Sequence, residues 1–188
     1  MGCYSDQCLC QLARSESLCS WTRPTTCSNA VRACIEKTCF PAWTKVLMAD
    51  GTKKNIEDVN VWDIVLSYNT ETNINERSEV KQEIVHVDST HEMYELTVNW
   101  EILKATAVHP FYVRKSISSK DYAWIEAQNL KVWDILLMSD GNLAKIEKIN
   151  HYNNKETVYN LEVEWNHDYF VGRWYLVHNK KDELIIEG

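Results

Sequence analysis

One pattern occurs twice in residues 44–177, and this duplication constrains the fold more than any other feature of the sequence. Segment 56–66 returns at 125–137, and the alternating segment 94–100 returns at 159–165. A solenoid needs at least about three repeats to bury a continuous core. Two copies therefore predict a single domain made of two related halves about a pseudo-two-fold axis.

The repeated units have the patterns of β-strands. Segment 94–100 alternates apolar and polar residues, which is the period of a half-buried strand. Asp50-Gly51 and Asp140-Gly141 are pairs that favour hairpin turns. Helix-like pieces occur only near 55–59 and 125–130, and both are short. Further strands are expected at 64–68, 104–108, 135–138, 144–149 and 169–171. The predicted fold class is all-β, with many short intertwined strands and a duplicated core.

Four tryptophans recur with the duplication, since Trp62 matches Trp133 and Trp100 matches Trp165. Large aromatic side chains dominate the burial energetics of protein cores. We therefore expect these four side chains in the core and not at a ligand site.

All seven cysteines lie in the first 39 residues, which sets a boundary at Thr38-Cys39. Residues 1–38 carry four basic and three acidic groups, so the remaining 16 basic and 24 acidic groups follow the boundary. A segment this short is expected to need cross-links such as disulfides to fold. Zinc is the rival interpretation, but the segment has no Cys-x-x-Cys pair and no histidine. A short helix is expected to run up to the boundary. The six cysteines that could form three disulfides, in any of 15 pairings, are Cys3, Cys8, Cys10, Cys19, Cys27 and Cys34.

Charge and hydrophobicity argue against two kinds of partner, nucleic acids and membranes. With 20 basic and 27 acidic residues the net charge is −7, which argues against a nucleic-acid-binding surface. No apolar run approaches the length of about 20 residues that a membrane span needs. We expect a monomer that uses no nucleic acid, membrane, metal or cofactor.

Three short motifs bracket the duplicated region: 39–46 opens it, 106–111 lies in its middle, and 174–179 closes it. In this order they resemble the splicing blocks of the hedgehog/intein (Hint) superfamily. Segments 124–130 and 158–163 are especially similar to bacterial intein-like domains of the pretoxin type. The resemblance covers 39–179, so that 1–38 becomes a cysteine-rich N-terminal flank and 180–188 a short C-terminal flank.

The resemblance implies a Hint fold and an autocatalytic domain that breaks peptide bonds at its own termini in a single turnover. At the first end, Cys39 attacks the preceding Thr38-Cys39 amide and forms a thioester. A thiol with a pKa near ~8.5 is only slightly ionised at pH 7, so this step needs help. His109 can donate a proton to the scissile nitrogen while Thr106 holds the geometry by a hydrogen bond. Taken alone, Cys39 could instead be a disulfide partner.

At the other end, Asn179 can attack its own main-chain carbonyl and form a succinimide, which releases the chain from Lys180 onward. An amide nitrogen is a poor nucleophile, so proton donors are needed here too. His178 precedes the asparagine directly, and the resemblance implies that His167 assists. The substrates are then the chain's own flanking polypeptides.

Three departures from the family pattern bear on this chemistry. Many inteins have an aspartate where this chain has Asn160, and an asparagine cannot act as a general base. Glycine is usual at the positions of Trp62 and Trp133, so we expect turns there that do not use positive φ. Splicing usually needs Ser, Thr or Cys where this chain has Lys180, so cleavage is favoured over splicing.

Other interpretations stay open. They are full protein splicing, a hedgehog-like acyl transfer to a small nucleophile such as a sterol, and an inactive Hint scaffold that carries a disulfide-rich binding segment. Hedgehog domains lack the terminal His-Asn, which disfavours the second. Pretoxin-type relatives occur in secreted proteins, so the resemblance points to a secreted or cell-surface parent that releases a C-terminal effector.

Overall fold

The computed structural model describes residues 38–179, which form twelve strands and two short 3₁₀ helices without an α-helix in that range. The predicted all-β class is confirmed. The 3₁₀ helices are η1 (Ile56–Asp58) and η2 (Ala127–Asn129). The strands are β1 (Phe40–Pro41), β2 (Lys45–Leu47), β3 (Lys53–Asn55), β4 (Ile64–Asn69), β5 (Ile74–Val98), β6 (Glu101–Thr106), β7 (Pro110–Arg114), β8 (Ala123–Glu126), β9 (Ile135–Leu137), β10 (Leu143–Val163), β11 (Asp168–Val171) and β12 (Tyr175–His178).

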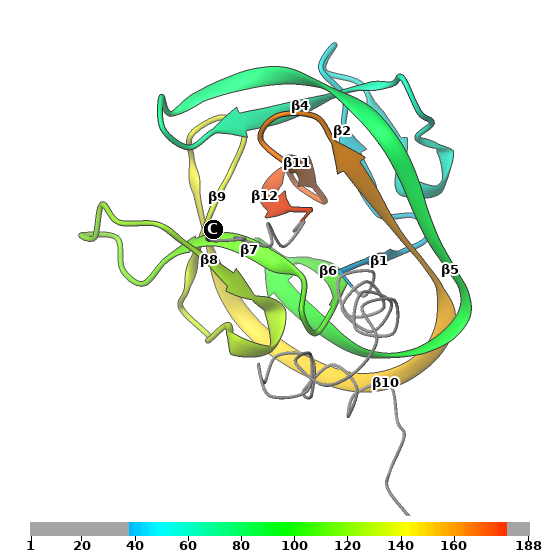
Figure 1. The fold of residues 1–188 in the computed structure, drawn as a ribbon. Coiled ribbons are helices and arrows are strands. Elements are labelled where there is room, and N and C mark those ends of the chain that lie inside the picture. Colours follow the sequence, from blue (N-terminus) through cyan, green and yellow to red (C-terminus); the bar gives the residue numbers. More distant parts are fainter. Residues whose placement is uncertain (1–37, 180–188) are drawn as a thin grey trace, which may run out of the picture. The chain divides into compact units, whose positions relative to one another are not determined.

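Two strands are much longer than the sequence pattern predicts. β5 has 25 residues and β10 has 21, and they pair antiparallel along most of their length. The register shifts between Ile146 and Lys148 and again between Glu156 and Val158, and such bulges bend a ribbon. Figure 1 shows β5 and β10 curving together around β11 and β12. Their middle parts are largely exposed, so they lack the strong apolar alternation by which strands are recognised.

The sheet order brings the two ends of the described chain together. It runs β3-β2-β11-β12-β7-β9-β10-β5-β4, and β1 pairs with β10 off this path. Phe40 of β1 lies opposite Tyr159 of β10, while Val177 of β12 lies opposite Phe111 of β7. The first and last strands are thus both held by inner strands.

The duplicated residues make duplicated hydrogen bonds. The N–H of Trp62 donates to the carbonyl of Val80, and the N–H of Trp133 donates to the carbonyl of Ile146, both at 2.9 Å. Lys54 pairs with Asp63, and Lys115 pairs with Asp134, both at 2.7 Å. The two Gly turns also match, since Gly51 donates to Met48 and Gly141 donates to Met138. The repeat in sequence is therefore a repeat in local structure.

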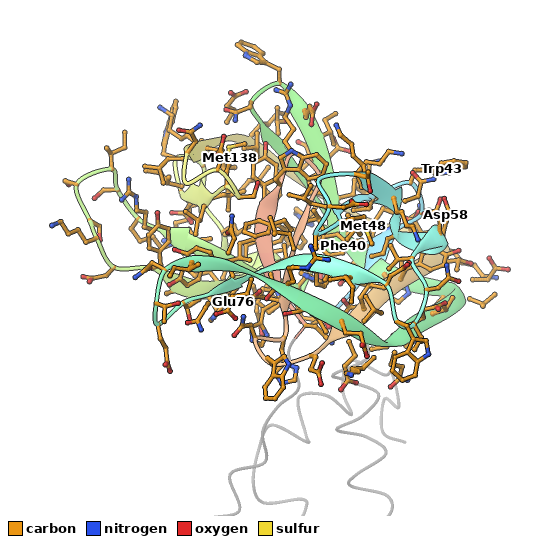
Figure 2. All side chains as sticks on the ribbon, turned by 90° about the horizontal axis from the view of Figure 1, so that it is seen from above. Phe40, Trp43, Met48, Asp58, Glu76 and Met138 are labelled. Carbon is orange, nitrogen blue, oxygen red and sulfur yellow. The ribbon has the colours of Figure 1, made fainter. Side chains whose placement is uncertain are left out.

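The four recurring tryptophans are not in the core. Their exposed fractions are 70% for Trp62, 90% for Trp100, 63% for Trp133 and 77% for Trp165, so the core prediction was wrong. The core instead holds residues such as Phe40, whose position inside the domain contrasts with that of Trp43 at its rim (Figure 2). These tryptophans occupy turns, where the backbone directs the side chain outward whatever its hydrophobicity.

The prediction about the two Trp-Asp turns was also wrong. Trp62 has φ 77° and Trp133 has φ 79°, so both turns use the left-handed region despite their bulky side chains. Some other predictions fall outside residues 38–179: the six cysteines before Cys39, the helix leading to the boundary, and Lys180. No helix of the described part is long and apolar enough to cross a membrane.

Candidate active site

The N-terminal candidate bond lies in the interior of the domain. Thr38 is 5% exposed and Cys39 is fully buried. The N–H of Cys39 donates to Oγ1 of Thr106 at 2.8 Å. The carbonyl of Cys39 accepts both the Thr106 hydroxyl at 3.2 Å and the Thr106 N–H at 2.9 Å. Thr106 therefore holds both the main-chain N–H and the main-chain carbonyl of Cys39.

His109 is fully buried in an apolar setting beside this bond. Its ring centroid lies 4.1 Å from that of Phe40 and 5.9 Å from that of Phe111. Burial, and to a lesser extent the charge of His178, lowers the pKa of His109 to about 3. The Thr38 backbone acts the other way and raises this pKa, although neither ring nitrogen makes a well-formed hydrogen bond. The imidazole is therefore neutral at pH 7 and sits next to the main chain of Thr38.

The C-terminal candidate bond begins at a buried asparagine. Asn179 is 4% exposed, and its N–H donates to the carbonyl of His167 at 2.6 Å. The rings of His167 and His178 have centroids 6.4 Å apart. His167 has φ 52°, and its Nδ1 atom is buried without a hydrogen-bond partner in the described part of the chain. Both predicted histidines are thus at this end of the domain.

Asn160 joins the two ends. Its Nδ2 group donates to Oγ1 of Thr38 at 3.0 Å and to Oδ1 of Asn179 at 3.2 Å. Its Oδ1 atom accepts the hydroxyl of Tyr169 at 2.7 Å and the N–H of Leu161 at 2.8 Å. The sequence singled out Asn160 as a departure from the intein pattern, and in the structure one amide group contacts both candidate bonds.

Tyr169 was missed from the sequence. It is fully buried, and burial raises the pKa of its hydroxyl well above the usual value, with the charge of Cys39 adding to this effect. The hydroxyl is therefore un-ionised at neutral pH and acts as a donor to Asn160. Its position in the apolar segment 169–171 marks it as a core residue, so nothing in the sequence distinguishes it.

Asp168 is a second group that the sequence did not indicate. Its carboxyl is buried and accepts the Ser67 hydroxyl at 2.7 Å and the Tyr68 N–H at 2.8 Å. Its pKa is raised to about 7, mainly by burial and to a smaller extent by the charge of Glu76, while the two hydrogen bonds oppose the shift. Asp168 thereby ties β4 to β11, next to the His167 carbonyl that holds Asn179.

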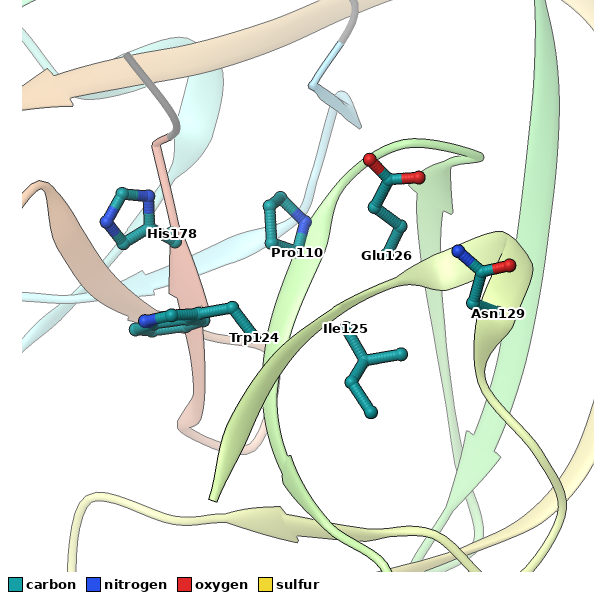
Figure 3. A pocket seen from close by; sticks show the side chains of 6 residues that line it. All are labelled: Pro110, Trp124, Ile125, Glu126, Asn129 and His178. Atoms are coloured by element: carbon teal, nitrogen blue, oxygen red, sulfur yellow. The ribbon is translucent and has the colours of Figure 1, made fainter. Parts of the chain in front are cut away.

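A cavity of about 450 Å³ opens beside the C-terminal end of the domain (Figure 3). Trp124 and His178 form one wall, with ring centroids 4.8 Å apart. The lining residues are Pro110, Trp124, Ile125, Glu126, Asn129 and His178. Residues 38–179 contain no group of three or more His, Cys, Asp or Glu side chains arranged to hold a metal ion.

An all-β fold that brings a buried cysteine, a Thr-x-x-His pair and a terminal His-Asn together is the structure of a Hint domain, and solved structures agree. The bacterial intein-like domain from Clostridium thermocellum is 35% identical, with 74% of this chain and 97% of that chain covered and a TM-score of 0.67. A DnaB intein from Synechocystis sp. PCC 6803 is 20% identical, with 77% and 99% covered and a TM-score of 0.62. The gp41-1 intein is 23% identical, with 75% and 98% covered and a TM-score of 0.58. The last two show the fold alone.

The family follows from a second comparison. The model of the pretoxin HINT domain matches residues 45–180, and this chain belongs to that family. A search of curated proteins finds no match. The predicted resemblance to Hint domains of the pretoxin type is thereby confirmed.

Proposed function

We propose that this domain cleaves its own chain at Thr38-Cys39 and at Asn179-Lys180, once at each bond. The observation that best supports this is the double hydrogen bond of Asn160, which holds Thr38 and Asn179 on one amide nitrogen. A domain that acts on both of its ends needs those ends in one place. Cys39 and Asn179 are also both buried, so both reacting side chains lie in the interior of the domain.

The first step begins with proton transfer from the Cys39 thiol to the neutral imidazole of His109. The thiolate attacks the carbonyl carbon of Thr38, and a tetrahedral intermediate forms. An imidazolium whose pKa is about 3 is a strong acid, so it returns the proton to the Cys39 nitrogen as the C–N bond breaks. The products are a thioester on Cys39 and a new amino group. At pH 7 only about one His109 in 10⁴ carries a proton at rest, so the histidine acts as a relay more than as a standing donor.

In the second step, Nδ2 of Asn179 attacks its own main-chain carbonyl carbon. Asn160 donates to Oδ1 of Asn179 and so fixes the plane of the attacking amide. The attacking Nδ2 group gives up one proton to the histidine pair, His178 and His167, and the nitrogen of Lys180 takes one proton from that pair as it leaves. The products are a C-terminal succinimide and a free amine on the released segment.

Cleavage prevails over splicing because position 180 is lysine. An amine with a pKa near ~10.4 is unprotonated in only about one molecule in a thousand at pH 7.4. Water or an added thiol therefore intercepts the Cys39 thioester first. The family description names a pretoxin, and we propose that in the parent protein the C-terminal cut releases the segment beyond Asn179.

Mass spectrometry of the purified chain tests this function. Dithiothreitol should accelerate release of residues 1–38, and Cys39→Ala should abolish that release while Cys34→Ala leaves it intact. Asn179→Ala should block loss of residues 180–188, and His178→Ala should slow it by roughly 10²- to 10⁴-fold. Unchanged release from both Cys39→Ala and Asn179→Ala would assign the cuts to a contaminating protease.

A further inference from the structure

One cavity lies close to the C-terminal candidate bond, because His178, the residue before Asn179, lines it. Its walls are apolar at Pro110, Trp124 and Ile125, and they carry one carboxylate, Glu126 (Figure 3). Glu126 is half-buried, and its Oε2 atom accepts a hydrogen bond from the Gln128 side chain at 2.7 Å. The proposed chemistry does not use this cavity.

The next residue in the chain is Lys180, which has an aliphatic stem and a cationic end. Such side chains bury the stem along apolar surface and keep the charge at a polar tip. The apolar walls and the single carboxylate fit both parts. We propose that this cavity is the subsite for the residue after Asn179, and that Glu126 selects a cationic side chain there. The proposal rests on the proposed function, because it concerns the same C-terminal cut.

The subsite has a consequence for catalysis. A side chain bound in this cavity would hold the leaving nitrogen near His178. The reason is that His178 both lines the cavity and directly precedes Asn179 in the chain. Positioning of this kind accelerates the step that breaks the bond. The identity of residue 180 therefore affects the rate of the C-terminal cut and leaves the N-terminal thioester step unaffected.

The experiment is a charge-reversal cycle in a Cys39→Ala background, which isolates the C-terminal cut. Glu126→Gln and Lys180→Met should each slow loss of residues 180–188 by about 2- to 5-fold, the range for a partly exposed ion pair. The double variant should be no slower than either single one, and Glu126→Lys with Lys180→Glu should recover the rate. Glu71→Gln, at an exposed turn, is the matched control.

The outcomes separate this proposal from the function on which it rests. No loss of the tail from the Cys39→Ala parent would overturn the proposed C-terminal cut itself. Normal loss of the tail with no effect of Glu126→Gln, or with single effects that simply multiply in the double variant, would overturn the subsite alone.

A separate observation concerns the tryptophans at turns. Six of the seven described tryptophans have positive φ, and the exception is Trp124 in β8. A bulky residue with positive φ is a genuine outlier in proteins. All three described glycines also have positive φ. The six are Trp43 (68°), Trp62 (77°), Trp100 (67°), Trp133 (79°), Trp165 (67°) and Trp174 (77°).

Packing does not explain these residues. Five of the six are more than half exposed, from 63% for Trp133 to 90% for Trp100. Lysine side chains lie over the rings of Trp62, Trp133 and Trp174, but nothing in these contacts requires positive φ. The whole chain has five glycines and eight tryptophans in 188 residues, whereas average usage of about 7% glycine gives roughly thirteen.

Glycine is the residue that adopts this backbone without strain. We infer that these six positions are glycine in the protein that the source cell makes. One codon connects the two residues: UGA is read as tryptophan in one variant genetic code and as glycine in another. The inference requires UGA at all six positions and the ordinary tryptophan codon UGG at Trp124, which lies in a regular strand.

The coding sequence and peptide masses of the protein from its source cell test this. UGA at the six positions with glycine in the peptides is the expected result, and UGG or tryptophan-containing peptides there would overturn it. Recombinant variants give a second measurement. Trp62→Gly and Trp133→Gly should each raise Tm by about 2 to 8 °C, whereas Trp124→Gly should lower it. A variant with all six glycines that is no more stable than the parent would also contradict the inference.

Discussion

Replacing the Thr106 hydroxyl by a methyl group tests how the N-terminal bond is held. Thr106→Val keeps the β-branched shape but removes the acceptor of the Cys39 N–H, which now donates at 2.8 Å. The Cys39 carbonyl still accepts the Thr106 N–H at 2.9 Å, so that oxygen keeps a partner. Thr106→Val therefore removes the hydrogen-bond acceptor of one buried group, the N–H of Cys39. An unsatisfied group of this kind costs about 1–3 kcal/mol.

This nitrogen is the leaving group of the proposed thioester step, so its placement affects the rate as well as the stability. If the same 1–3 kcal/mol is lost from the transition state, the rate falls by roughly 5- to 150-fold. The assay is thiol-induced release of residues 1–38, followed by intact mass over time in an Asn179→Ala background. Thermal unfolding reports the stability of each variant in parallel.

Thr106→Ser is the matched control, because it restores the hydroxyl without the methyl group. It should recover most of both the rate and the stability. A Thr106→Val domain that releases residues 1–38 within twofold of the parent rate, with unchanged Tm, would refute the reasoning that this hydrogen bond positions the bond.

Three further outcomes are expected. Asn160→Ala should slow release at both ends, unlike Thr106→Val, because one amide contacts Thr38 and Asn179; an effect at one end only, seen by intact mass, would contradict this. Burial raises the pKa of Asp168 from 3.8 to about 7, so the folded domain binds this proton more tightly than the unfolded chain. The free energy of unfolding should therefore fall by roughly 3 kcal/mol as pH rises from 4 to 7. Asp168→Asn should remove that decline in urea unfolding at several pH values, and an identical pH slope in both proteins would disprove it. Lys180→Cys should yield ligated product that joins residues 1–38 to residues 180–188, detected by its mass; ligation as the main product of the unmodified chain would show that position 180 does not prevent splicing.

Much of the fold was predictable because the duplication and the turn pairs are written in local patterns. The strand predicted at 64–68 is β4, that at 135–138 is β9, and the two short helical pieces are η1 and η2. The long strands were not predictable, since the middle of β5 and of β10 is held by a partner strand and not by a buried face. Main-chain hydrogen bonds between strands place few constraints on side-chain type, so a sequence pattern does not reveal them.

The site divides in the same way. Cys39, Thr106, His109 and Asn179 stand in short motifs, so their types and spacing single them out as candidates in the sequence alone. Asp168 contacts Ser67, which lies 101 residues away in the chain, and Tyr169 contacts Asn160 of the preceding strand, β10. Neither residue stands in a motif of its own. The prediction that four tryptophans lie in the core was wrong because it relied on their hydrophobicity. All four instead lie at exposed turns with positive φ.

The pairing of β1 with β10 sets the timing of any reaction at Cys39. A ribosome completes Phe40 long before it completes Tyr159, the residue opposite it in the ladder. Until then the first strand has no partner, and the amide of Asn160 is not there to hold Thr38. Under the proposed function, the nascent chain therefore stays intact until nearly the whole domain has been made. The proposed cleavage then depends on completion of the fold.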